Sequence, residues 1–199
     1  MSFQSFPKYN LDIKIQLFIF IISVGFAFIT NTININVSNA MYGNNDGILF
    51  GSTLSSPDNT WYLNQIVNYV NGFGFTIDPL DPIYSVRRTP GYPIFYGVHY
   101  LLFGEIGAHK VITFTQIFLH ALAAVCMFRI ACLISMSLKT AFLAAALYGL
   151  SPFISSFLFM TITESIFPAM IVFSIYLAFS CFINNSFLRS IFAGLMMAF

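Results

Sequence analysis

A few charged residues stand out in an otherwise apolar chain, and their types suit phosphate chemistry at a membrane surface. Asp58 and Glu164 are carboxylic acids, and a carboxylate at the water–membrane boundary can act as a general base. Arg87, Arg88 and Lys110 are cations. Guanidinium groups match phosphate oxygens, and each charge-assisted hydrogen bond contributes about 1.5 to 3 kcal/mol. Together these residues indicate a site for a phosphate-bearing lipid substrate.

The two acids also have a structural interpretation. Asp58 follows Ser56-Pro57, a pair typical of a helix start, so its charge could simply interact with the helix dipole. Glu164 follows Thr163 at the expected start of an apolar helix, so its charge could likewise interact with the helix dipole. Tyr62 comes one helical turn after Asp58, where it could hydrogen-bond the carboxylate or pack beneath it.

The cations have alternatives of the same kind. Arg87 and Arg88 could be solvated or could bind anionic lipid headgroups. Lys110, with His109 beside it, begins an apolar segment, and its long side chain could extend along that segment to the membrane interface.

Composition excludes two broad classes of protein. Of the 199 residues, 58% are hydrophobic and only 8% are charged, whereas a soluble domain has about 25% charged residues. The net charge of +1 leaves no basic surface for nucleic acid. The three cysteines lie in apolar runs without CxxC spacing, so we predict neither disulfides nor a metal site. The sequence is that of an integral membrane protein.

Apolar segments define the expected crossings. A helix needs about 20 apolar residues to cross the bilayer. Four segments approach that length and a fifth begins, namely residues 15–30, 111–134, 140–159, 165–183 and the partial 187–199. We therefore expect an all-α, polytopic membrane protein with four to five transmembrane helices. The last apolar segment is unfinished, so we expect the chain to be the front part of a longer protein.

Positive charges predict the orientation, because short loops rich in Lys and Arg stay in the cytoplasm. The cations that would lie inside are Lys8, Lys14, Arg129, Lys139 and Arg189. This arrangement puts an outer loop, residues 31–110, and the turn at 161–164 on the outside. Alternatively the first apolar segment is a signal peptide cleaved near Ser38-Asn39-Ala40, which leaves the same loop outside.

The outer loop is too long for a simple connection. The residues after Ser56-Pro57-Asp58 place apolar and aromatic side chains at spacings of one, three and four, which predicts an amphipathic helix on the membrane surface. Asn71-Gly72 ends it. The apolar segment 94–103 is too short to cross the membrane, so we expect it to form a second surface helix. It follows a stretch in which prolines impose turns.

Several short motifs follow one another in a familiar order. They are SPDNTWYL at residues 56–63, NGFGF at 71–75, RTPGYP at 88–93, Leu102-Phe103-Gly104, Gln116, Leu150-Ser151-Pro152 and Thr163-Glu164. In this order they resemble the start of the GT-C membrane glycosyltransferases, the group that contains protein O-mannosyltransferases and the bacterial aminoarabinose transferases that modify lipid A.

The resemblance implies roles for individual residues. Asp58 matches the catalytic acidic residue of the first outer loop, and Glu164 matches a second acid before the fourth span. Arg88 matches the basic residue that holds the lipid-linked phosphate, with Arg87 and Lys110 nearby. Asn59 departs from the pattern, since many relatives have a second acid there.

The expected function is therefore an inverting sugar transfer on the outer face of the cytoplasmic (inner) membrane. The donor would be a polyprenyl-phosphate sugar, because nucleotide sugars are not available there, and the acceptor a hydroxyl of a lipid, glycan or protein. The resemblance leaves a divalent cation open. Two other functions are compatible with the sequence: a transporter or channel subunit, and a non-catalytic membrane partner protein.

Overall fold

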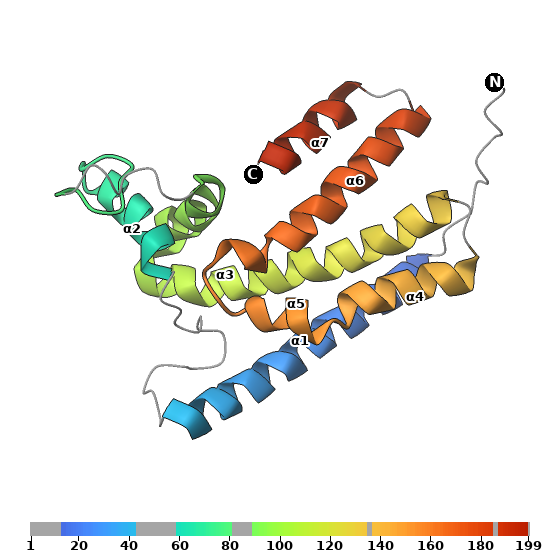
Figure 1. Cartoon of the computed structure of the whole chain (residues 1–199), viewed down its shortest axis with the longest axis horizontal. Coiled ribbons are helices and arrows are strands. Elements are labelled where there is room, and N and C mark those ends of the chain that lie inside the picture. Colours follow the sequence, from blue (N-terminus) through green and yellow to red (C-terminus); the bar gives the residue numbers. More distant parts are fainter. Residues whose placement is uncertain (1–12, 43–58, 81–88, 135–136, 185–186, 199) are drawn as a thin grey trace.

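The computed structural model describes residues 13–42, 59–80, 89–134, 137–184 and 187–198, and every regular element in these ranges is a helix. For this part of the chain the predicted all-α fold class is confirmed. The elements, in chain order, are α1 (Ile13–Tyr42), α2 (Asn59–Val70), α3 (Gly91–Leu133), α4 (Leu138–Gly149), α5 (Pro152–Phe157), the 3₁₀ turn η2 (Thr163–Ser165), α6 (Phe167–Asn184) and α7 (Phe187–Ala198) (Figure 1).

The longest helix, α3, has a sharp break at Gly104. The backbone there has φ +67° and ψ 177°, a conformation that residues with a Cβ atom rarely adopt. The break separates an arm, residues 91–103, from a long part, residues 105–133. At 1.5 Å per residue the arm is about 20 Å long, too short to cross a bilayer, whereas the long part is about 44 Å. The segments 94–103 and 111–134, expected separately, thus belong to one bent helix.

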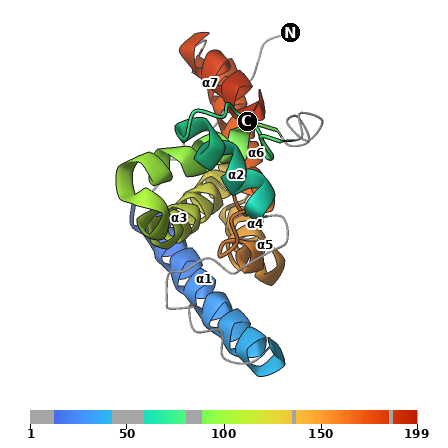
Figure 2. The same cartoon turned by 90° about the vertical axis from the view of Figure 1, so that its left-hand side faces the viewer.

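The arm of α3 is fastened to the long part beyond the break. His99 Nε2 lies 3.0 Å from the Thr115 hydroxyl. The rings of Tyr96 and His109 are 5.6 Å apart. These contacts hold the arm at an angle to the long part, and α2 lies alongside it (Figure 2).

α3 is also the central helix of the fold, because α1, α2, α4 and α6 all contact it. The long part packs against α1 and α4 through an apolar cluster that includes Ile19 and Phe128. Gly149, the last residue of α4, lies so close to Ser23 of α1 and Ala124 of α3 that a Cβ atom there would collide with them. Small residues that let helices approach closely are typical of membrane helix contacts.

α4 and α5 follow each other with a short interruption. The Ser137 hydroxyl caps α4 by accepting a hydrogen bond from the Thr140 N–H, at 3.2 Å. The Ser151 hydroxyl caps α5 in the same way, and Pro152 takes the first helical position, where no N–H is needed. The chain then turns through η2 into α6. As a result α1, the long part of α3, α4 with α5, and α6 run in alternating directions (Figure 1).

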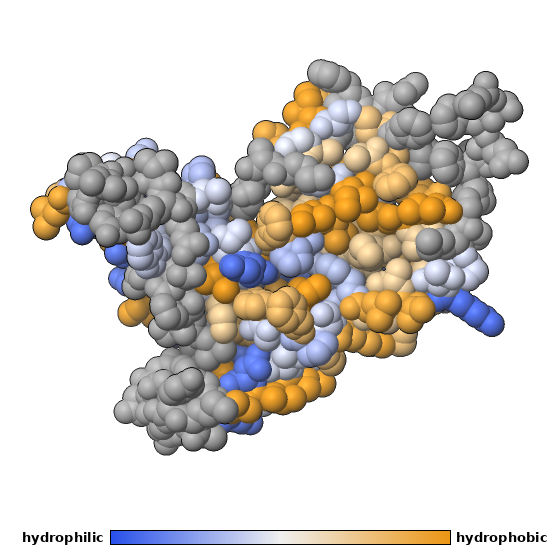
Figure 3. All heavy atoms as spheres, viewed as in Figure 1, coloured by the Kyte–Doolittle hydropathy of each residue, from blue (hydrophilic) through white to orange (hydrophobic). Residues whose placement is uncertain are grey.

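Three stretches in the described part of the chain are long and apolar enough to cross a membrane: Ile13–Val37, Gly91–Leu133 and Leu138–Phe157. Large apolar side chains are exposed along them, including Phe18, Ile21, Phe114, Phe118, Leu143 and Leu147. Figure 3 shows apolar residues over the long helices and more hydrophilic ones around α2. Soluble monomers rarely expose so much apolar surface, so these are the properties of a membrane protein.

The fourth expected crossing, residues 165–183, corresponds to α6. Its apolar stretch, Phe167–Cys181, is shorter than the roughly 20 residues of a straight crossing. The expected total of four to five crossings, with the partial one at 187–199, therefore stays a prediction.

The first helix is longer than the apolar segment that predicts it. α1 continues to Tyr42, beyond the expected span 15–30. The hydroxyls of Thr30 and Thr32 each donate to the carbonyl four residues earlier, at 3.0 Å. Because these hydroxyls bond within the helix, polar residues continue it instead of ending it. The first residues of the expected outer loop are thus helical.

Replacing Gly104 with alanine tests the bend in α3. Gly104→Ala is expected to destabilise the protein by about 1 to 3 kcal/mol, because the backbone conformation is unfavourable for any residue with a Cβ atom. Thermal unfolding in detergent measures the loss. Gly25→Ala in α1 is the matched control, since nothing lies within 4 Å of its added Cβ. Equal stability of the two variants would contradict the strained bend.

Candidate functional site

Gln116 is the centre of a buried hydrogen-bond network that joins segments far apart in the sequence. Its side chain is completely buried. Its Oε1 accepts a hydrogen bond from the Tyr92 hydroxyl at 2.7 Å. The Ser165 hydroxyl has two acceptors for its one proton, Gln116 Oε1 at 2.9 Å and the Ile162 carbonyl at 2.6 Å. Its Nε2 donates to the carbonyls of Leu158 at 2.7 Å and Met160 at 3.2 Å. All four hydrogen-bonding positions of the amide are therefore used. One side chain ties both parts of α3 to the turn that contains η2.

Tyr92 extends this network to α2. Its ring meets that of Tyr62 edge to face, with 5.4 Å between the ring centres. Both tyrosines are buried, and they share an apolar cluster with Ile66 of α2, Ile112 of α3 and Ile166 after η2. Edge-to-face aromatic pairs contribute about 0.5 to 1.5 kcal/mol beyond burial. Through Tyr62, Tyr92 and Gln116, α2 is linked to the η2 turn.

Three of the predicted site residues, Asp58, Arg87 and Arg88, lie outside the described residues. Their neighbours in the sequence do not. Asp58 comes four residues before Tyr62, and Arg88 comes four residues before Tyr92. Tyr62 and Tyr92, which belong to the network, therefore lie close in sequence to Asp58 and Arg88.

The remaining predicted site residues take different positions. Glu164 is exposed in η2, directly before Ser165 of the network. Lys110 is exposed on the long part of α3, and no ion pair joins it or Glu164 to another described residue. His109 is half-buried against the Tyr96 ring. Tyr62 is 4% exposed, so it packs in the core and presents little surface to a substrate.

The elements next to the predicted site lie toward one end of the helix bundle. The end of α1, α2, the start of α3 and the η2 turn are on the left-hand side of Figure 1. The start of α1, the end of α3 and the start of α4 are on the right. Because successive helices alternate in direction, the end of α1 and the turn that follows α5 lie at the same end of the bundle (Figure 1).

A second polar contact, which is partly buried, lies nearer the opposite end. Arg129 Nε donates to Gln16 Oε1 at 2.7 Å, and its Nη1 donates to the Tyr176 hydroxyl at 3.0 Å. This residue joins α1, α3 and α6. The sequence analysis used Arg129 only as a marker of orientation. The position of Arg129 within an apolar run could have indicated this contact, because an ionisable group at membrane depth needs polar partners.

Histidine and acidic residues do not gather into a metal site in the described ranges, where no group of three potential ligands is found. His120 is instead 3.3 Å from the Gly149 carbonyl through Nε2, and its ring stacks on Tyr148. His120 thus joins α3 to α4.

Comparisons with protein-family models, with curated proteins and with solved structures find no match to this chain. The functional interpretation therefore depends on the residues and their geometry.

Replacing Gln116 tests the network. Gln116→Leu keeps the volume but leaves two hydroxyls and two carbonyls without this partner, so we expect a loss of about 2 to 4 kcal/mol in thermal or denaturant unfolding. Gln65→Leu in α2 is the matched control. Gln65 is equally buried, but its amide has no hydrogen-bond partner among the described residues, so its loss is expected to be neutral or stabilising. The network interpretation fails if both variants behave alike.

Proposed function

We propose that the protein transfers a sugar from a polyprenyl-phosphate donor to an acceptor hydroxyl at the outer membrane surface. The single observation that supports this function is the linkage of α2, the arm of α3 and η2 through Tyr62, Tyr92 and Gln116. Each of these three elements follows or contains one group that the chemistry requires.

The distances along the chain are short enough for the three groups to share one site. Asp58 is four residues from Tyr62, a stretch that is helical from Asn59 and rises about 1.5 Å per residue. Arg88 is four residues from Tyr92, a separation that cannot exceed about 14 Å even in a fully extended chain. Glu164 is adjacent to Ser165. Since Tyr62, Tyr92, Gln116 and Ser165 are joined by three successive contacts, a lipid-linked sugar phosphate could contact all three groups.

The proposed step forms one bond and breaks one. The acceptor oxygen attacks the anomeric carbon, and Asp58 takes the acceptor proton as general base. The bond from the anomeric carbon to the phosphate oxygen breaks on the opposite face, so the configuration inverts. Arg88, with Arg87 and Lys110, stabilises the negative charge of the departing lipid phosphate. Glu164 orients the acceptor hydroxyl.

The membrane properties of the fold suit this donor. A polyprenyl chain is apolar and remains in the bilayer, where the long helices expose apolar side chains. The more polar region around α2 lies at one end of those helices, where the phosphate and the sugar would meet water (Figure 3).

Removing the proposed base tests the function. In lipid vesicles, Asp58→Asn is expected to lower the rate of sugar transfer from a radiolabelled polyprenyl-phosphate sugar by about 100-fold or more. Asp46→Asn is the matched control, because it removes an acid of the same expected outer loop that has no proposed role. Transfer undiminished by Asp58→Asn would remove Asp58 from the mechanism. If the protein instead moved the labelled lipid across the vesicle membrane without transferring the sugar, the function would be transport.

A further inference from the structure

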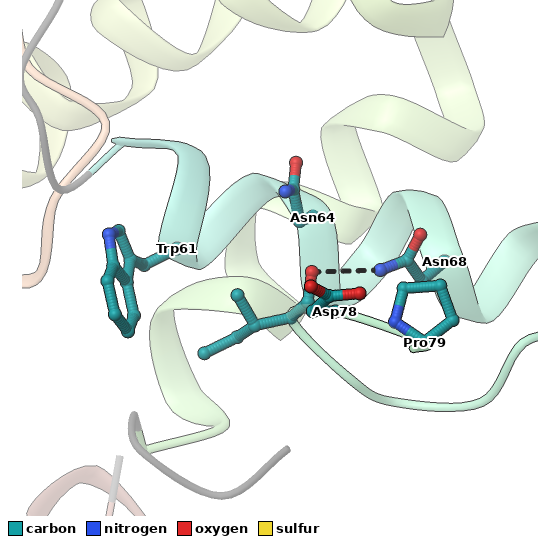
Figure 4. Close-up of a pocket in the computed structure, with 6 residues that line it drawn as sticks. Trp61, Asn64, Asn68, Asp78 and Pro79 are labelled. Atoms are coloured by element: carbon teal, nitrogen blue, oxygen red, sulfur yellow. Dashed lines mark hydrogen bonds between the residues drawn. The ribbon is translucent and has the colours of Figure 1, made fainter. Parts of the chain in front are cut away.

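A pocket of about 430 Å³ lies between α2 and the segment that follows it. Its lining residues are Trp61, Asn64, Asn68, Ile77, Asp78 and Pro79. The first three come from α2, and the last three come from residues 71–80, which follow α2 and are called the returning segment (Figure 4). This pocket is separate from the Gln116 network, with which it shares no residue.

Helix geometry explains one wall of the pocket. Trp61, Asn64 and Asn68 have spacings of three and four residues, which places them on one face of α2. The opposite face of the helix carries Tyr62 and Ile66, which are buried in the core. The pocket side of α2 is therefore free to present polar side chains.

The other wall is held in place by hydrogen bonds. Asn68 Nδ2 donates to the carbonyls of Thr76 at 2.9 Å and Ile77 at 3.1 Å. The Thr76 hydroxyl donates to the Asp78 carbonyl at 2.9 Å, and the Leu80 N–H donates to Asp78 Oδ1 at 2.9 Å. Asn68 thus fastens the returning segment to α2, and one oxygen of the Asp78 carboxylate is held by the Leu80 N–H, while the other has no hydrogen-bond partner among the described residues.

The side chains of the pocket suit one class of ligand. An indole ring offers a flat apolar face, an Asn amide both donates and accepts hydrogen bonds, and a carboxylate accepts them. A pyranose sugar has the complementary surface, since one face of its ring exposes C–H groups and its edge exposes hydroxyls. The described residues that line the pocket include no cation, and Asp78 would repel a phosphate.

We propose that this pocket binds a neutral pyranose sugar. The ring stacks on Trp61, and its hydroxyls bond to the Asn64 amide and the Asp78 carboxylate. Because the pocket lies on the helix that directly follows Asp58, the bound sugar would be adjacent to the proposed transfer site. Only this role as a substrate subsite rests on the proposed function; the binding itself does not.

Trp61 provides a specific probe, because it is the only tryptophan of the chain. The protein is purified in a detergent without a sugar headgroup and titrated with methyl α-D-mannopyranoside and methyl α-D-glucopyranoside. We expect a saturable change in tryptophan fluorescence. A linear, unsaturable response to both sugars would overturn the proposal.

Two variants connect the signal to the pocket. Asn64→Ala and Asp78→Asn are each expected to weaken binding by about fivefold or more, the equivalent of one hydrogen bond. Asp78→Asn retains an oxygen that can accept from the Leu80 N–H, so the turn is preserved. Asn71→Ala, beyond the end of α2 and outside the lining, is the control. Unchanged affinity in both pocket variants would also overturn the proposal.

The same variants separate this proposal from the proposed function. In the transfer assay, a raised KM for the lipid-linked donor would assign the pocket to the donor sugar, and a raised KM for a glycan acceptor would assign it to the acceptor. Transfer with both KM values unchanged would leave the transferase function intact and remove the subsite. Saturable sugar binding without any transfer would retain the site and overturn the function.

Discussion

The fold depends on the need of one buried amide to be fully hydrogen-bonded. Gln116 lies within an apolar helix, where an unpaired polar group would cost about 1 to 3 kcal/mol. Its partners are 24, 42 and 49 residues away in the sequence, at Tyr92, Leu158 and Ser165. Satisfying one side chain therefore requires the α3 arm, the end of α5 and the η2 turn to meet. The break at Gly104 allows this, because it turns the arm away from the direction of the long part.

This constraint connects the apolar body of the protein to its polar end. The long helices contact one another through small residues and expose large apolar side chains, as a bilayer requires. The end of α1 and the η2 turn lie at one end of the bundle, where Tyr62 and Tyr92 attach α2 to the same network (Figure 1). The proposed sugar transfer would need such a rigid support, since catalytic groups must be held within a fraction of an ångström.

Local sequence signals predicted much of the secondary structure. Apolar runs indicated the long helices, and a helix forms after Asp58. The expected span 140–159 is instead divided into α4 and α5, because Ser151-Pro152 begins a new helix. The network was not predictable, because contacts between residues tens of positions apart leave no periodic signal. Gln116 entered the sequence analysis only as part of a resemblance. The length of α1 was underestimated, since threonine hydroxyls bonded to the helix backbone offset the polarity of its second half. Asp58, Arg87 and Arg88 remain sequence-based predictions.

The central claim is that Asp58 and Glu164 face the same side of the membrane, and cysteine labelling tests it most directly. The native cysteines, Cys126, Cys132 and Cys181, are first replaced with serine. Single cysteines are then introduced as Asp58→Cys, Glu164→Cys and Lys139→Cys, and intact cells are treated with a membrane-impermeant maleimide. The account predicts that positions 58 and 164 react in intact cells and that position 139 reacts only after permeabilisation. Reaction of positions 58 and 164 from opposite sides would contradict it.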